Sequence, residues 1–143
     1  MLGATRDAET TKGNGFSGTF NGTQDDTTNT GSADDEDGVA SFPTSSTSDG
    51  VYTVSVAYNG SGRLCGWIDF DKSGTFDADE QAVCKTVSGI GNVNLIFTVP
   101  VSDRSNTGDF YARFRIASTA SQAESPTGSA SDGEVEDYLI TGI

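Results

Sequence analysis

The chain has 143 residues, and its 8 basic residues against 21 acidic residues give a net charge of −13. This charge repels phosphate backbones and anionic lipid, which excludes nucleic acid and membrane surfaces as favourable partners. The chain contains no histidine, so a serine or cysteine nucleophile would lack its usual base. Abundant glycine and scarce proline, with polar residues between short apolar runs, are typical of an all-β protein with many turns. We therefore expect one all-β domain over residues 1–143.

Taken in chain order, the first strand signal is weak, because Phe16 and Phe20 stand alone in a polar stretch. Residues 21–32 are a low-complexity loop. Apolar runs then predict strands at residues 39–42, 51–58, 64–70, 81–87, 93–99, 110–116 and 138–143. Residues 118–131 read as a long surface loop. This pattern predicts an antiparallel two-sheet β-sandwich of jelly-roll or immunoglobulin type, with about 7–8 strands and long polar loops.

Three of the predicted strands alternate clearly between apolar and other residues, which assigns their inward faces. The side chains predicted to face the core are Tyr52, Val54, Val56, Tyr58, Val93, Leu95, Phe97, Val99, Phe110, Ala112, Phe114 and Ile116. The same alternation places Tyr111, Arg113 and Arg115 on the opposite face of the strand at 110–116.

No stretch is long and apolar enough to span a bilayer, so membrane insertion is not expected. Residues 1–4 lack the basic and apolar regions of a signal peptide. We interpret Met1 as the start of a piece of a larger extracellular protein.

Residues 69–80 fit the register of a twelve-residue calcium loop. Calcium takes six to eight oxygen ligands, and Gly74 stands where such a loop must turn sharply. The predicted ligands are Asp69, Asp71, Ser73, Thr75 through its carbonyl, Asp77 and Glu80. The apolar residues 64–68 before the loop predict a strand rather than the helix of an EF-hand. The sequence therefore predicts a Ca²⁺ site between two strands, and the alternative is a solvated acidic turn.

The two cysteines, Cys65 and Cys84, flank this loop almost symmetrically. Their placement across one hairpin predicts a disulfide, and a disulfide implies an exported protein. The alternative is a pair of free thiols in a cytosolic protein.

Two period-two pairs, Glu134/Glu136 and Arg113/Arg115, could share one face of adjacent strands and form a surface ion-pair ladder. The alternative is a second cation site that joins carboxylates from the two chain ends. Its candidate residues are Asp34, Asp35, Asp37, Glu134, Glu136 and Asp137.

Aromatic side chains raise the question of glycan binding, for which Trp67 and Tyr111 are the candidate contacts. A core position is the more common one for a lone tryptophan that alternates with an isoleucine. No pair of carboxylates stands out as a hydrolytic pair, so we expect no enzyme activity.

Five motifs occur in order along the chain: DDEDGV at 34–39, GWIDFD at 66–71, FTVP at 97–100, YARFR at 111–115 and DGEVEDY at 132–138. Together they resemble the GEVED-domain family, whose name matches residues 133–137. The resemblance spans roughly residues 2–143 and implies a β-sandwich module of large secreted or surface-anchored bacterial proteins, including adhesin-like chains and multidomain enzymes. One departure is Ser73, where the family pattern favours Asn or Asp, and this implies a weaker ligand.

From these observations we expect a calcium-stabilised, non-catalytic structural or adhesive module at the bacterial cell surface or secreted from it. The alternative is a carbohydrate- or peptide-binding module accessory to an extracellular enzyme or adhesin. The expected partners are neighbouring domains of the parent protein and, for the alternative, a glycan or peptide.

Overall fold

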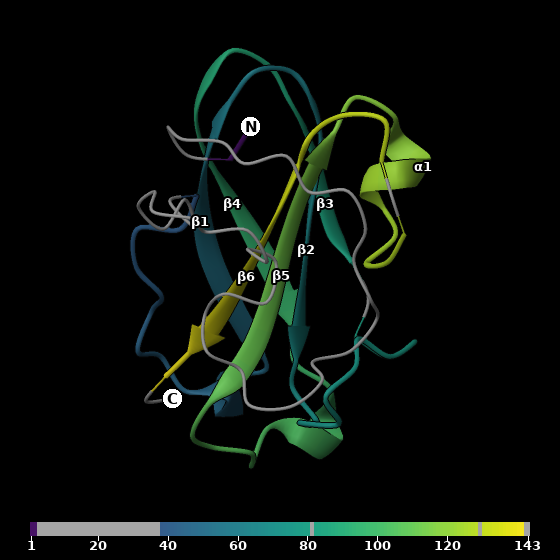
Figure 1. Ribbon diagram of the computed structural model, residues 1–143. Coiled ribbons are helices and arrows are strands. Elements are labelled where there is room, and N and C mark those ends of the chain that lie inside the picture. Colours follow the sequence, from purple (N-terminus) through teal and green to yellow (C-terminus); the bar gives the residue numbers. More distant parts are fainter. Residues whose placement is uncertain (3–37, 81, 129, 142–143) are drawn as a thin grey trace, which may run out of the picture.

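The computed structural model describes residues 1–2, 38–80, 82–128 and 130–141. Within these residues, six strands form two antiparallel sheets that pack face to face (Figure 1). The strands are β1 (Val51–Asn59), β2 (Gly62–Asp69), β3 (Val83–Val87), β4 (Ile90–Thr98), β5 (Phe110–Ala117) and β6 (Glu134–Ile140). One sheet pairs β1 with β4, and the other has the order β3-β2-β5-β6. The predicted all-β sandwich is confirmed.

The core lies between the two sheets, and the predicted alternation builds it. On β1, Tyr52, Val54 and Val56 are buried, whereas Val51 and Ser55 face solvent. The buried side chains that alternate in the same way on the partner strands are Leu95, Phe97, Phe110, Ala112, Phe114 and Ile116. Full burial of a large apolar side chain stabilises a fold by about 1.5–3 kcal/mol. These contacts therefore hold the sheets together.

The outer face of the four-stranded sheet carries a second, smaller cluster. It contains Cys65, Trp67, Phe76, Ala117 and Ala123, all of them buried. Ala123 belongs to α1 (Ala120–Ala123), a single helical turn within the 118–133 connection. This connection, predicted as surface material only, therefore covers part of the sheet.

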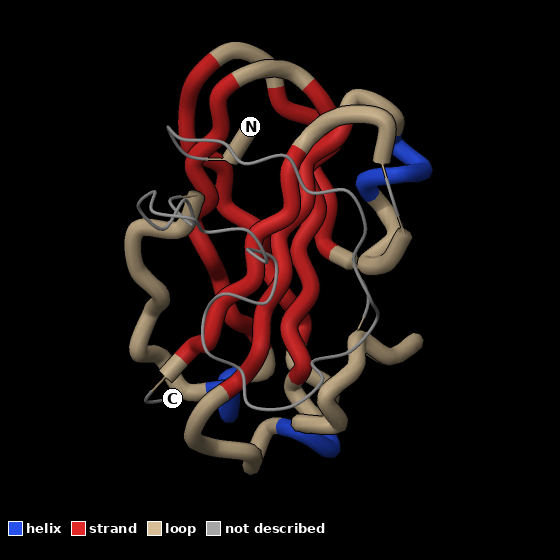
Figure 2. The backbone as a smooth tube through the Cα atoms, viewed as in Figure 1, coloured by secondary structure: helices blue, strands red, loops and turns tan. Residues whose placement is uncertain are grey.

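The short helices lie outside the sheets, one directly before β1 and two in connections between strands (Figure 2). Besides α1 they are the 3-10 turns η1 (Thr47–Asp49) and η2 (Val101–Asp103). No helix in the described part of the chain is long and apolar enough to cross a membrane.

Two predicted elements differ from the structure, and a third is not tested. Residues 39–42 form no strand, although the Gly38 carbonyl accepts a hydrogen bond from Ala57 N at 2.7 Å. β6 begins at Glu134, four residues before the predicted start, because its first inward residues are glutamates and give no apolar signal. The weak signal at Phe16 and Phe20 lies outside the described residues.

Candidate metal site

The acidic loop predicted to bind calcium joins β2 to β3, as expected, at the end of the sandwich away from α1 (Figure 1). Three of the predicted ligands converge there. One carboxylate oxygen each from Asp69, Asp71 and Glu80 lies within 4.8 Å of the other two. Asp69 is fully buried and Glu80 is 4% exposed, whereas Asp71 faces solvent. This trio could hold a metal ion.

Backbone amides of the loop itself orient the two buried carboxylates. Asp69 accepts hydrogen bonds from Ser73 N at 3.0 Å and Gly74 N at 2.9 Å. Glu80 accepts longer hydrogen bonds from Asp71 N at 3.3 Å and Asp77 N at 3.2 Å. Asp69 and Glu80, the first and last predicted ligands, are thereby hydrogen-bonded to the backbone of the residues between them. The loop is therefore already curved around the point where an ion would bind.

The remaining predicted ligands lie beside the trio and contact one another. The Ser73 hydroxyl lies 3.1 Å from the Thr75 carbonyl and 2.9 Å from the Asp77 carboxylate. The Thr75 hydroxyl donates to Asp77 Oδ1 at 3.0 Å. Since Ser73 N also binds Asp71 and Asp69, one connected network links all the predicted ligand residues.

The electrostatics of the trio favour a cation. Burial, followed by the neighbouring Asp71, raises the pKa of Asp69 to about 6. Burial raises the pKa of Glu80 to about 8, with added repulsion from Asp69 and Asp71. Within the described residues neither buried carboxylate forms an ion pair with lysine or arginine. A bound cation would relieve this repulsion.

Two side chains of the loop anchor it to the rest of the domain. Phe76 packs against Trp67 with ring centroids 6.4 Å apart. The Lys72 ammonium donates a hydrogen bond to the Thr107 carbonyl and lies 4.9 Å from the centroid of the Phe110 ring. The lysine inside the acidic loop therefore binds the neighbouring connection instead of the carboxylates. The sequence carries no signal for this contact.

The predicted disulfide between Cys65 and Cys84 is present, with an S–S distance of 2.04 Å. The two residues are direct partners in the β2–β3 register. The disulfide and the acidic loop therefore close the same hairpin.

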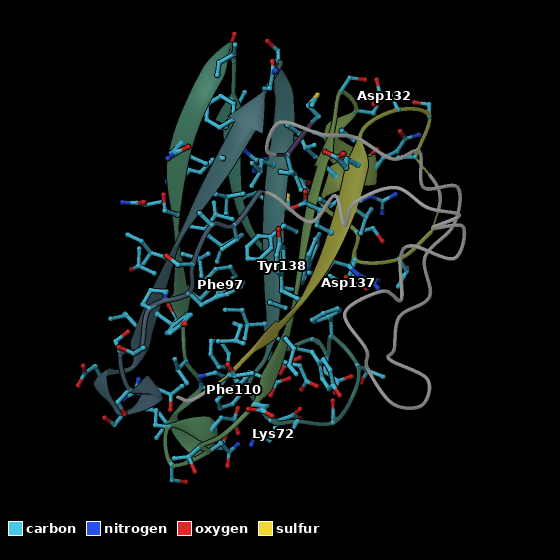
Figure 3. The ribbon with its side chains drawn as sticks, turned by 60° about the vertical axis from the view of Figure 1, so that its left-hand side comes forward. Lys72, Phe97, Phe110, Asp132, Asp137 and Tyr138 are labelled. Atoms are coloured by element: carbon cyan, nitrogen blue, oxygen red, sulfur yellow. A yellow bond between two sulfur atoms is a disulfide. The ribbon has the colours of Figure 1, made fainter. Side chains whose placement is uncertain are left out.

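The predicted ladder between Glu134/Glu136 and Arg113/Arg115 is wrong, because the two pairs lie on opposite faces of the sheet. The register places Arg113 opposite Asp137, while the inward Phe114 lies opposite Glu136. Arg113 instead forms a two-pronged ion pair with Asp137, with N–O distances of 2.6 and 2.7 Å. Figure 3 shows Asp137 and Tyr138 pointing to opposite sides of β6. A one-residue offset of register exchanges the faces, and sequence periodicity does not reveal that offset.

Arg115 is 2% exposed and binds backbone instead of a glutamate. Its guanidinium donates to the carbonyls of Ser125, Thr127 and Gly128 at 2.8–3.0 Å. Burial, and then the charge of Arg113, lower the pKa of Arg115. The two arginines thus hold the 118–133 connection against the sheet, since Arg113 also donates to the Pro126 carbonyl.

A family model of the GEVED domain matches residues 63–141, more than half of the chain. The chain belongs to the GEVED-domain family. No curated protein and no solved structure matches it. The match runs from β2 to β6 and includes the acidic loop, both cysteines and the Arg113–Asp137 pair. The GEVED match does not include β1 or the acidic motif at 34–39, although the sequence resemblance extended to them.

Trp67 does not form the exposed glycan platform considered from the sequence. It is 3% exposed and packs beneath Phe76 in the outer cluster, which is the core position that its alternation with Ile68 favoured. Tyr111 is half-buried on the same face of the sheet. Of the two candidate contacts, only Tyr111 keeps partial access to solvent in the GEVED domain.

The residues of the possible second cation site are only partly described, because Asp34, Asp35 and Asp37 lie outside the described residues. Glu134 and Glu136 face inward, but Asp137 faces outward and is paired with Arg113. The GEVED domain therefore does not direct all three C-terminal carboxylates to one point.

Proposed function

We propose that the β2–β3 loop of this GEVED domain binds Ca²⁺ and that the domain is a calcium-stabilised, non-catalytic structural or adhesive module. The observation that carries the proposal is the convergence of Asp69, Asp71 and Glu80 within 4.8 Å, two of them buried. Burying two carboxylates is costly unless a cation or hydrogen bonds compensate. An ion held at this point would join the end of β2 to the approach to β3.

Calcium fits the donor set better than zinc or copper does. All the predicted ligands are oxygens, the chain has no histidine, and both cysteines are oxidised. Zinc and copper sites use nitrogen or sulfur ligands, whereas carboxylate, hydroxyl and carbonyl oxygens suit calcium. Asp69, Asp71, Ser73, Asp77, Glu80 and the Thr75 carbonyl would hold the ion. When bound, the ion supplies charge neutralisation and cross-linking of the loop.

A location outside the bacterial cytoplasm, secreted or at the cell surface, belongs to the same proposal. The Cys65–Cys84 disulfide supports it, because disulfides persist in oxidising compartments. Millimolar calcium outside the cell would also keep a site of micromolar affinity filled. Neighbouring domains of a longer protein would be the partners of such a module.

Terbium luminescence tests the metal site directly, because Tb³⁺ replaces Ca²⁺ at oxygen sites and Trp67, the chain's single tryptophan, packs against loop residue Phe76. We expect excitation of Trp67 to sensitise bound Tb³⁺, and Ca²⁺ to quench that signal by competition. Glu80→Gln should weaken Ca²⁺ binding at least about tenfold, since it removes a ligand charge. Asp79→Asn is the matched control, because Asp79 is exposed and lies between ligand positions.

Equal Ca²⁺ affinity of Glu80→Gln, Asp79→Asn and the wild-type chain would contradict the site. A glycan array and a peptide panel, read with calcium and with chelator, test the non-catalytic structural role. Calcium-dependent binding that is lost in Tyr111→Ala would replace the structural role by the carbohydrate- or peptide-binding alternative.

A further inference from the structure

The inward face of β6 carries two glutamates where a sandwich core normally has apolar side chains. Glu134 lies opposite Ile116 and Glu136 opposite Phe114, both of them core residues of β5. Glu134 is 5% exposed and Glu136 is 2% exposed. Carboxylates in such a place require strong hydrogen-bond donors.

The donors include backbone amides from the beginning of the described chain. Leu2 N donates to Glu134 Oε2 at 2.5 Å. Gly38 N lies 3.3 and 3.2 Å from the two carboxylate oxygens of Glu136.

Tyr138 extends this row of acceptors. Its hydroxyl donates to Glu136 Oε2 at 2.8 Å and accepts from Val39 N at 3.1 Å. Glu134, Glu136 and Tyr138, which follow one another at the two-residue spacing of a strand, thus each accept a hydrogen bond from a backbone N–H group.

The same upstream residues bind β1 on their other side. Leu2 forms a bridge with Tyr58, and Asn59 N donates to the Met1 carbonyl at 2.9 Å. The Gly38 carbonyl accepts from Ala57 N at 2.7 Å. Residues 1–2 and 38–39 therefore lie between β1 of one sheet and β6 of the other. The side chains of Leu2 and Val39 are buried in the common core.

Close packing at Gly38 supports a specific fit. A Cβ atom at this position would lie 2.5 Å from Glu136 Oε2 and 2.8 Å from the Leu2 Cβ. The backbone at Gly38 thus lies closer to the carboxylate than a residue with a Cβ atom would allow without a shift.

We propose that Glu134, Glu136 and Tyr138 form a docking site for backbone of the upstream chain, which is filled here by two short stretches, residues 1–2 and 38–39. The ligand chemistry is a row of backbone N–H donors, and the glutamates provide charge-assisted acceptors. The docked residues precede the family-matched region 63–141. The stable unit of this GEVED domain therefore includes upstream chain that the family match omits. This role is independent of the metal loop.

Amide hydrogen exchange followed by NMR on the full chain tests the docking site. In Glu136→Gln the Gly38 amide loses its charged acceptor, and the Tyr138 hydroxyl that binds the Val39 amide loses the same carboxylate. Amide exchange at Gly38 and Val39 should therefore accelerate at least about tenfold, which corresponds to about 1.4 kcal/mol. Exchange at core amides such as Leu64 and Phe114 should accelerate no more than exchange at Gly38 and Val39, because a loss of global stability affects both sets of amides. Glu124→Gln is the matched control, because Glu124 is exposed and binds Arg63.

Tyr138→Phe provides a milder variant in case Glu136→Gln unfolds the domain. It removes only the phenolic oxygen, so exchange at Val39 should accelerate more than exchange at Gly38. Wild-type exchange at Gly38 and Val39 in both variants would overturn the proposal. Selective acceleration at these two amides when chelator is added to the wild-type chain would also overturn it, in favour of a cation between the carboxylates.

Discussion

Replacing Asp137 by asparagine removes one charge from the buried Arg113–Asp137 pair while keeping the size of the side chain. The side chains of Arg113 and Asp137 are 4% and 0% exposed. The asparagine can accept one hydrogen bond, but its NH₂ group cannot accept the second one. The Arg113 charge then stays buried, with the Pro126 carbonyl as an uncharged acceptor at 2.7 Å.

Breaking a buried, hydrogen-bonded ion pair from one side costs about 3–5 kcal/mol. We expect Asp137→Asn to lose this amount in free energy of unfolding. At about 4 °C per kcal/mol for a domain of this size, the Tm should fall by about 12–20 °C. Removing both charges in an Arg113→Met, Asp137→Leu double variant should cost less than Asp137→Asn alone, because neither charge of the pair then remains buried.

Urea unfolding and calorimetry of the full chain, with calcium held constant, provide the measurement. The control is Glu124→Gln, which breaks the Arg63–Glu124 pair with side chains 32% and 45% exposed. An exposed pair contributes at most about 1 kcal/mol, so this variant should melt within a few degrees of wild type. The reasoning fails if Asp137→Asn and Glu124→Gln have equal effects, or if the double variant is less stable than Asp137→Asn.

Three further predictions concern the loop hairpin and the start of β6. With calcium at about a hundred times its Kd, chelation should remove about 2.7 kcal/mol and lower the Tm by about 10 °C. Glu80→Gln should reduce that response to about half or less, because a site tenfold weaker contributes about 1.4 kcal/mol at the same calcium concentration; an unchanged wild-type melt would contradict the prediction. A Cys65→Ser, Cys84→Ser double variant should lose about 3 kcal/mol in urea unfolding, as a closed loop of this length implies; an unchanged urea midpoint would count against this. Gly133→Ala should lose more than about 2 kcal/mol, because Gly133 has φ +97° and a Cβ would lie 1.8 Å from the Ile116 carbonyl oxygen; a wild-type melting curve would refute the argument.

The sequence was most informative where local chemistry alone decides the structure. The alternation in β1, β4 and β5 predicted which side chains enter the core, because a strand has a period of two whatever it packs against. The loop at 69–80 was readable for a similar reason, since a twelve-residue ligand register is a local pattern. The disulfide followed from the hairpin that this loop creates.

The sequence was least informative where a contact depends on register between distant strands. Glu134 and Glu136 do share one face of β6, and Arg113 and Arg115 share one face of β5, as their two-residue spacing predicted. Which face of β6 lies beside which face of β5 depends on the register, which places Asp137 opposite Arg113 and is a property of the assembled sheet. The wrapping of the 118–133 connection around buried arginines has no periodic signal at all. Neither has the contact between Glu136 and Gly38, which are 98 positions apart.

The signature, residues 133–137 after which the family is named, is mostly buried, and this limits what family membership says about function. Glu134, Glu136 and Asp137 are at most 5% exposed. The contacts described for them include Leu2, Gly38, Arg113 and Tyr138, all within the domain. Since these residues present almost no surface to a ligand, in this chain the residues 133–137 that give the family its name contribute to assembly of the sandwich. Two GEVED domains can therefore share the signature and bind different partners, because recognition depends on exposed side chains that the signature leaves unspecified. The acidic loop differs from the signature in this respect, since Asp71 and Asp77 remain exposed to an incoming ion.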